Sequence, residues 1–195
     1  MEALAYFGAG SRARQNQRDL PGLSSKECVV IKNYIPSQDH SADLLFHAMA
    51  TEVPFHVKRW NGLYKLPQKA FHYTMSARKK KPLQNVEDVI VRLQAEYPVE
   101  VSEVWCNLFE NGSHRIDWHQ DQYGEHLFVL SLGAARVVQF RDMKTKKPTL
   151  ELEVNHGDLY YMHPNFDKSH EHCVPAVPHS EPRISLAIFA KDIRP

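Results

Sequence analysis

Two side chains able to bind a metal ion stand two residues apart in the segment WHQD (118–121). Because alternate side chains of a strand point to the same face, His119 and Asp121 would direct an imidazole and a carboxylate toward one point. A further His from a neighbouring strand would complete the set; His172 is the best placed candidate and His170 its rival. Two His and one carboxylate on one side of a metal are typical of non-haem Fe(II) oxygenases.

The spacing of these two residues is weak evidence by itself, because the chain contains 12 histidines and such a pair can arise by chance. In that case His119 would be a surface or strand-end residue and Asp121 would form a turn. The sequence that follows favours the metal site, and the Val-Pro pair at 174–175 favours His172 over His170.

Six segments between about residues 101 and 190 follow one another as in the AlkB-like dioxygenases. They are CNLFENG (106–112), WHQD (118–121), SLGAAR (131–136), HGDLYYM (156–162), HCVP (172–175) and EPRISL (181–186). The chain therefore resembles this family over its second half. The resemblance implies an Fe(II)- and 2-oxoglutarate-dependent dioxygenase in which His119, Asp121 and His172 bind the metal.

The reaction that the resemblance implies uses Fe(II), 2-oxoglutarate and O2. 2-Oxoglutarate is converted to succinate and carbon dioxide while a C–H bond of the substrate is hydroxylated. On an N-methyl group the hydroxylated product loses formaldehyde, so the overall reaction is demethylation. The metal and co-substrate supply the difficult chemistry, whereas the protein fixes the geometry and excludes side reactions.

Three residues are candidates for binding 2-oxoglutarate. Arg183 suits the distal carboxylate, because its planar guanidinium can bind a carboxylate bidentately and is costly to bury unpaired. Ser185 faces the same side of the strand and can add a hydrogen bond, and Asn107 matches the family's co-substrate asparagine. The alternatives are an edge-strand Arg and a strand-end amide with its own partners.

The chain departs from the family at three places. Phe109 stands where the family has a tyrosine two residues after Asn107, so a hydroxyl contact to the co-substrate is missing. Phe189 replaces a second arginine, and Gln-Tyr-Gly (122–124) replaces acidic residues that read the damaged base in DNA-repair members, with Glu125 the nearest acid. These changes affect the substrate assignment more than the iron chemistry.

The segment 53–81 is rich in aromatic and basic residues. Such a mixture can stack a flipped or single-stranded base while binding its backbone, and the segment matches the nucleotide-recognition lid of the family in position. The alternative is a surface hairpin with Trp60 and Phe71 in the core and a solvated lysine run. The candidate substrate-binding residues are Trp60, Tyr64, Lys69, Tyr73 and Arg78.

The elements that must position these residues are mostly strands. We expect strands at 28–31, 101–109, 127–132, 136–140, 149–154, 158–162 and 183–190. Many short strands at this spacing predict a mainly β protein with flanking helices, a double-stranded β-helix or jelly roll. One helix should begin with Ser37 or Ser41 as its cap, with Leu44, Leu45, Ala48 and Met49 on one face; a second should run from Asn85 to Pro98.

Length and composition predict one compact domain, since the chain has 195 residues, 43% hydrophobic and 24% charged. We expect a flexible arm over 1–25 and one AlkB-like dioxygenase domain over 26–195, with the lid and supporting helices in 26–100 and the jelly-roll core in 101–195. The three Cys do not have the spacing of a disulfide framework or zinc site, and no apolar run could span a bilayer. We expect a cytoplasmic or nuclear monomer.

The leading functional hypothesis is demethylation of N-alkylated bases in DNA or RNA. The net charge of +1 does not by itself indicate a nucleic-acid partner. Oxidation of a protein or small-molecule substrate is therefore the alternative. A binding module that kept the fold without activity is the third hypothesis, in which the metal ligands and Arg183 would be surplus.

Overall fold

The computed structural model describes residues 20–23, 28–60, 64–121 and 125–193. Most of the arm expected over 1–25 lies outside these ranges. At its described end, Leu20 and Leu23 are buried in the core, so this part of the segment packs against the domain.

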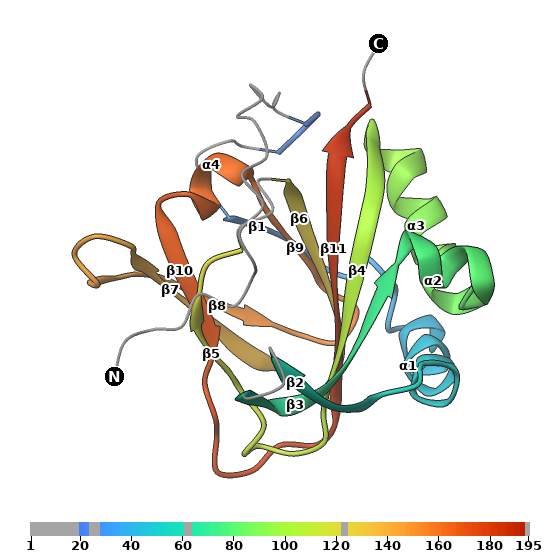
Figure 1. Cartoon of the computed structure of the whole chain (residues 1–195), viewed down its shortest axis with the longest axis horizontal. Helices are drawn as coiled ribbons and strands as arrows, with labels where there is room; N and C mark the ends of the chain where they lie inside the picture. Colours follow the sequence, from blue (N-terminus) through green and yellow to red (C-terminus); the bar gives the residue numbers. More distant parts are fainter. Residues whose placement is uncertain (1–19, 24–27, 61–63, 122–124, 194–195) are drawn as a thin grey trace.

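Two antiparallel sheets face each other, as Figure 1 shows. The seven-stranded sheet contains, in spatial order, β1 (Cys28–Ile31), β9 (Leu159–Met162), β6 (His126–Gly133), β11 (Arg183–Asp192), β4 (Val99–Phe109), β3 (Tyr64–Thr74) and β2 (His56–Trp60). The four-stranded sheet contains β5 (Ile116–His119), β10 (His170–Val174), β7 (Arg136–Asp142) and β8 (Pro148–Val154). The arrangement confirms the predicted jelly roll. The segment 53–81, for which the sequence left a recognition lid or a surface hairpin open, supplies the β2–β3 hairpin at one edge of the large sheet.

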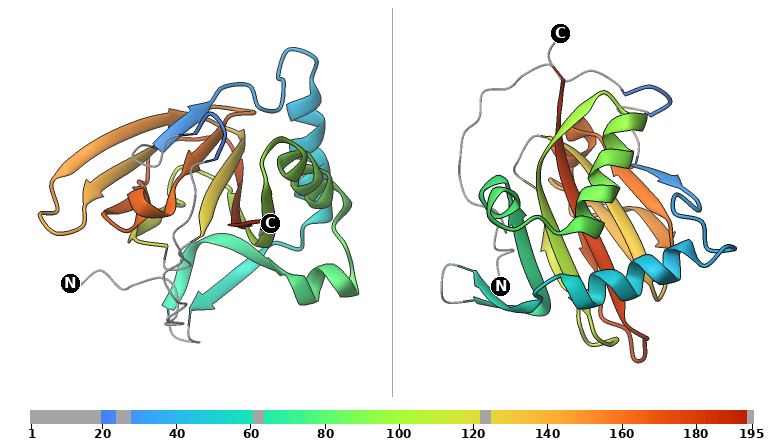
Figure 2. Two further views of the ribbon diagram at one scale, coloured as in Figure 1. Left: turned by 90° about the horizontal axis from the view of Figure 1, so that it is seen from above. Right: turned by 90° about the vertical axis from the view of Figure 1, so that its right-hand side faces the viewer.

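The two longest helices of the described ranges cover the outer face of the large sheet (Figure 2). The four helices of the described ranges are α1 (Ser41–Glu52), α2 (Met75–Lys80), α3 (Gln84–Glu96) and α4 (Pro164–Asp167). The predicted helix near 85–97 is confirmed by α3, whose buried residues recur at helical spacing. No helix in the described ranges is both long and apolar enough to cross a lipid bilayer.

The expectation for α1 was partly wrong. Its N-cap is His40, with φ 62° and no side-chain cap hydrogen bond, rather than Ser37 or Ser41. Leu44, expected on the buried face, is 70% exposed, and Ala42 is buried beside Met49 instead. The cause is that Ala42 and Met49, seven residues apart, lie along one line of the helix, and Leu44 falls outside this line.

The two faces of β11 belong to different layers. Ile184, Leu186 and Ile188 lie in the apolar cluster between the large sheet and the helices. Ala187 and Phe189 belong to the cluster between the two sheets. Because side chains alternate along a strand, Arg183 and Ser185 must also point between the sheets.

The turn after β6 requires a glycine. Gly133 has φ +87°, and a Cβ there would lie 2.4 Å from the carbonyl oxygen of Pro182. A residue with a side chain would be strained by both the backbone angle and this contact. The turn delivers the chain from β6 of the large sheet to β7 of the small one.

Candidate metal centre

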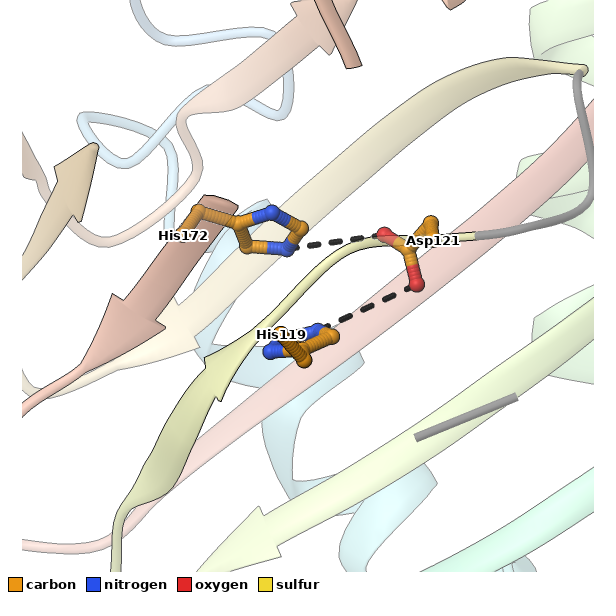
Figure 3. A group of neighbouring side chains, drawn as sticks. All are labelled: His119, Asp121 and His172. Carbon is orange, nitrogen blue, oxygen red and sulfur yellow. Dashed lines mark ion pairs between the residues drawn. The ribbon is translucent and has the colours of Figure 1, made fainter. Parts of the chain in front are cut away.

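His119, Asp121 and His172 converge between the sheets (Figure 3). His119 is the last residue of β5 and lies opposite His172 of β10 in the register of the small sheet. One donor atom from each of the three residues lies within 4.8 Å of the other two, and all three side chains are buried. Nε2 of His119 is 3.8 Å from Oδ1 of Asp121, and Nε2 of His172 is 3.5 Å from Oδ2.

The protonation of the two imidazoles suits a metal ligand. Nδ1 of His119 lies 2.9 Å from the carbonyl oxygen of Asp117, which can only accept, so Nδ1 carries a proton and Nε2, which faces Asp121, is the nitrogen available to a metal. Burial holds the pKa of His172 well below its usual value, and the neighbouring His119 lowers this pKa further. The His172 ring is therefore neutral. Two neutral imidazoles and a carboxylate are the donors that Fe(II) takes in oxygenases. The donor set therefore fits an iron ion.

The surroundings of Asp121 disfavour the charged form of its carboxyl group when no cation is bound. Burial raises the pKa of Asp121, and the neighbouring His119 lowers it by a smaller amount. A bound divalent cation would reverse this effect, because it favours the charged carboxylate.

His170, the rival ligand, lies elsewhere. Its ring stacks on Phe166 with a centroid distance of 3.9 Å and an interplanar angle of 8°, and it pairs with Asp142 at the start of β10. Cys173, next to His172, faces away from the metal ligands and lies 3.7 Å from Oε1 of Gln139. Cys173 is buried at this position and therefore serves packing.

The segment after β5 is positioned by α4. The backbone N–H of Asp121 donates to Oδ1 of Asp167 at 3.3 Å, and Nε2 of Gln120 donates to the Asp167 carbonyl at 2.7 Å. Burial, together with the charge of Asp121, holds the pKa of Asp167 well above its usual value. The sequence offered no signal for Asp167, because its partner is 46 residues away in the chain.

Arg183 is a buried cation that forms no ion pair with the residues the structure describes. It is 1% exposed, and its Nε donates to Oγ of Ser131 at 2.9 Å. Its Nη1 is buried without a hydrogen-bond partner among the described residues. Burial lowers its pKa to about 10, with Tyr160 opposing and Arg136 adding to this effect, so the group is still charged near neutral pH. A buried, incompletely paired guanidinium predicts an anionic ligand.

A cavity of about 700 Å³, including its open mouth, lies against the three candidate ligands. Besides the candidate ligands, the lining residues are Leu66, Gln68, Trp105, Asn107, Ile116, Leu127, Val129, Tyr160, Val174, Ser185, Ala187 and Phe189. Asn107 and Ser185, both expected at the co-substrate, are paired across β4 and β11. Arg183 does not line the cavity itself; it lies two residues from Ser185 on the same face.

Two of the expected substrate-binding residues lie away from this cavity. The Tyr73 side chain is fully buried beneath α3, where its hydroxyl donates to Glu87 at 2.6 Å and accepts from the backbone N–H of Leu83 at 2.8 Å. Arg78 binds both carboxylate oxygens of Glu87, at 2.8 and 2.7 Å. These contacts join α2 to α3, so they give both side chains a structural role.

The other three candidates have different outcomes. Lys69 forms an ion pair of 2.7 Å with Glu110 at the edge of the sheet and is 36% exposed. It therefore remains accessible to a ligand. The side chains of Trp60 and Tyr64 lie outside the part of the chain that the structure describes.

Tyr73→Phe should lower stability without changing catalysis. The variant leaves a buried backbone N–H without its acceptor, which costs about 1–3 kcal/mol. Urea unfolding measures the loss, and Tyr97→Phe, whose hydroxyl has no hydrogen bond to described residues, is the control, expected within about 0.5 kcal/mol of the parent. Unchanged stability together with a raised KM for an oligonucleotide would instead restore a substrate role.

Sequence reasoning missed most of the cavity wall, including Trp105. The ring of His72 stacks on Trp105 with centroids 4.2 Å apart, and Nζ of Lys58 lies 3.9 Å from a Trp105 ring centroid. One signal was present: Trp105 precedes Asn107 by two residues, so an inward Asn107 implied an inward Trp105. Tyr160 had no comparable signal.

Comparison with known proteins gives two matches of different kinds. The model of the 2OG-Fe(II) oxygenase superfamily matches residues 27–188. The solved structure of OsALKBH1 superposes with a TM-score of 0.59 at 13% sequence identity, covering 84% of this chain and 98% of that chain. At this identity the likeness shows a shared fold alone. A search of curated protein sequences with this chain found no match.

Proposed function

We propose, from the premise that the chain belongs to the 2OG-Fe(II) oxygenase superfamily, that it demethylates N-alkylated bases in DNA or RNA. Membership of this superfamily makes the chain an Fe(II)- and 2-oxoglutarate-dependent dioxygenase, and its fold is AlkB-like. When bound, Fe(II), 2-oxoglutarate and O2 supply the hydroxylation of a substrate C–H bond. The residues of the chain hold these groups, orient the substrate and exclude water.

Each of the buried polar groups has a separate task in this proposal. His119 and His172 would bind iron through Nε2 and Asp121 through its carboxylate, since these atoms already face one another. Arg183 would bind the distal carboxylate of 2-oxoglutarate, with Ser185 and Asn107 beside it. Nε2 of Gln68 donates to Oδ1 of Asn107 at 3.3 Å, which turns the Asn107 amide so that Nδ2 can donate to a bound acid.

The β2–β3 hairpin is the observation that favours a nucleic-acid substrate. It contributes Leu66 and Gln68 to the cavity wall, while Arg59 and Lys65 are exposed on the same hairpin. A cavity with an aromatic wall beside exposed cations suits a base turned out of its stack, whose phosphates remain outside. Exposed lysines at 79–81 extend the basic surface along the chain.

The charge of the cavity bears on which bases fit. Among the described residues that line it, Asp121 supplies the one carboxylate, and the metal would use it. A cationic base such as 1-methyladenine would be buried without a counter-charge, which is costly. Neutral methylated bases, such as N6-methyladenine, avoid this cost.

Formaldehyde release tests the proposal. Single- and double-stranded DNA and RNA oligonucleotides with one methylated base are compared with methylated peptides, and succinate is measured in parallel. We expect release from at least one oligonucleotide class, with neutral bases favoured by about tenfold or more, the factor that corresponds to roughly 1.4 kcal/mol.

Two controls accompany this assay. Unmethylated oligonucleotides of the same sequence report turnover of 2-oxoglutarate that is not linked to substrate. Succinate formation without formaldehyde from any nucleic acid would contradict the proposed substrate while leaving the dioxygenase chemistry intact.

A protein or small-molecule substrate is the second candidate. The apolar character of most lining residues and the net charge of +1 favour it. Formaldehyde release from methylated peptides, with none from oligonucleotides, would support it.

A further inference from the structure

Tyr160 is a cavity residue that the functional assignments above leave without a task. It lies on β9, is 4% exposed, and lines the same cavity as His119, Asp121 and His172. Its ring therefore faces the space between the sheets. Its hydroxyl forms no hydrogen bond with any residue that the structure describes, although a buried phenol usually has a partner.

The register of the large sheet brings Tyr160 close to the guanidinium of Arg183. Tyr160 pairs with Val129 of β6, and Ser131 follows two residues later on the same face of β6. Arg183 extends from β11 across this face, because its Nε donates to Oγ of Ser131. The head group of Arg183 is thus drawn over β6 toward β9, the strand that carries Tyr160.

The surroundings of the Tyr160 hydroxyl fit a site between the metal ligands and the buried cation. Burial raises the pKa of the Tyr160 phenol; the neighbouring Cys28 and Asp121 add to this effect, and the Arg183 guanidinium opposes it. A ligand that reaches from the metal centre to Arg183 would pass this hydroxyl.

Phe109 flanks Arg183 from the opposite side without offering a polar contact. It lies on β4, pairs with Arg183 in the register, and its ring centroid is 5.0 Å from the guanidinium carbon. An anion held by Arg183 can accept no hydrogen bond from Phe109. Tyr160, which approaches over β6, has the hydroxyl that Phe109 lacks.

We propose that Tyr160 is a co-substrate-binding residue whose hydroxyl donates a hydrogen bond to the 2-oxoglutarate carboxylate that Arg183 holds. The contact replaces the hydroxyl absent at Phe109 with one from a different strand. The inference rests on the assignment of Arg183 to the co-substrate and is independent of whether the substrate is a nucleic acid.

Tyr160→Phe tests the inference by removing one oxygen atom. Anaerobic titration of the Fe(II)-loaded protein with 2-oxoglutarate, followed by the charge-transfer absorption of the complex, gives Kd without turnover. We expect Kd to rise about tenfold or more, the size of one hydrogen bond to a charged group. The KM for 2-oxoglutarate should rise in parallel, with kcat at saturation nearly unchanged.

Tyr161→Phe is the matched control on the same strand. The Tyr161 ring is fully buried in the cluster beneath the helices, and its hydroxyl lies 2.8 Å from Nδ1 of His126. Its loss should lower stability and leave the Kd for 2-oxoglutarate within twofold of the parent. Titration with Mn(II) in the absence of co-substrate should give equal metal affinity for the parent and Tyr160→Phe.

A Kd for 2-oxoglutarate within twofold of the parent in Tyr160→Phe would overturn the inference, and so would a raised KM for the oxidised substrate alone. Loss of 2-oxoglutarate binding in an Arg183 variant under the same conditions would show that only the Tyr160 assignment had failed. If the Arg183 variant also bound normally, the co-substrate site itself would be misplaced.

Discussion

Replacing Asp121 with Ala is expected to abolish succinate formation and to weaken Fe(II) binding by more than about 100-fold. Its carboxylate faces Nε2 of both histidines, at 3.8 and 3.5 Å, so its loss removes one of the three candidate ligands and the one negative charge among them. Changes to residues that only support a metal ligand already cost roughly 10–100-fold in affinity. Metal content after dialysis and anaerobic Fe(II) titration measure the effect.

The metal-free protein should respond differently to this change. Burial makes the charged form of Asp121 unfavourable, so the metal-free variant should be at least as stable as the parent. Asp117→Ala is the matched control, because this half-exposed residue two positions before His119 forms an ion pair with Arg115. It should retain metal and turnover; an Asp121→Ala variant that also retained both would refute the metal centre.

Replacing Arg183 with Met is expected to raise the Kd for 2-oxoglutarate by about 100-fold or more. Removing one partner of a hydrogen-bonded charge pair inside a buried site costs roughly 2–5 kcal/mol of binding free energy. This range applies because Arg183 is only 1% exposed. Met fills similar space without charge. Anaerobic titration with 2-oxoglutarate measures the change, while Fe(II) affinity without co-substrate should be unaffected.

Two further variants make the Arg183 result specific. Arg183→Lys keeps a charge but loses the planar fork, so its affinity should lie between those of the parent and the Met variant. Arg92→Met, on the exposed side of α3, removes a guanidinium that pairs with Glu96 and should not change 2-oxoglutarate binding. Equal affinities in the parent and Arg183→Met would place the distal carboxylate elsewhere.

The parts of the site that could be predicted from the sequence depend on local rules. The H-x-D spacing placed His119 and Asp121 together, and the alternation of β11 placed Arg183 and Ser185 opposite Ile184 and Leu186. The α3 helix was predictable because its buried residues repeat with the helical period. Each of these inferences involves residues only a few positions apart.

The errors arose where long-range packing decides. Tyr73 and Arg78 belong to an aromatic and basic segment, yet both bind Glu87 of α3 because the chain folds back beneath that helix. Leu44 has the hydrophobicity of a core residue but is exposed, since α1 presents Ala42 and Met49 to the domain. Composition alone could not distinguish a cation that binds a ligand from one that binds its own protein.

The sequence by itself predicted the fold class, the three candidate metal ligands and the candidate anion-binding arginine, because strand alternation and the family-like segments that carry these residues are properties of short stretches of chain. Only the tertiary structure decided which other side chains share their cavity. Tyr160 and Trp105 are 55 residues apart in the sequence, and both line this cavity because β9 and β4 lie on either side of β6 and β11 in one sheet. Strand order follows from burying both faces of that sheet at once, which no single segment specifies.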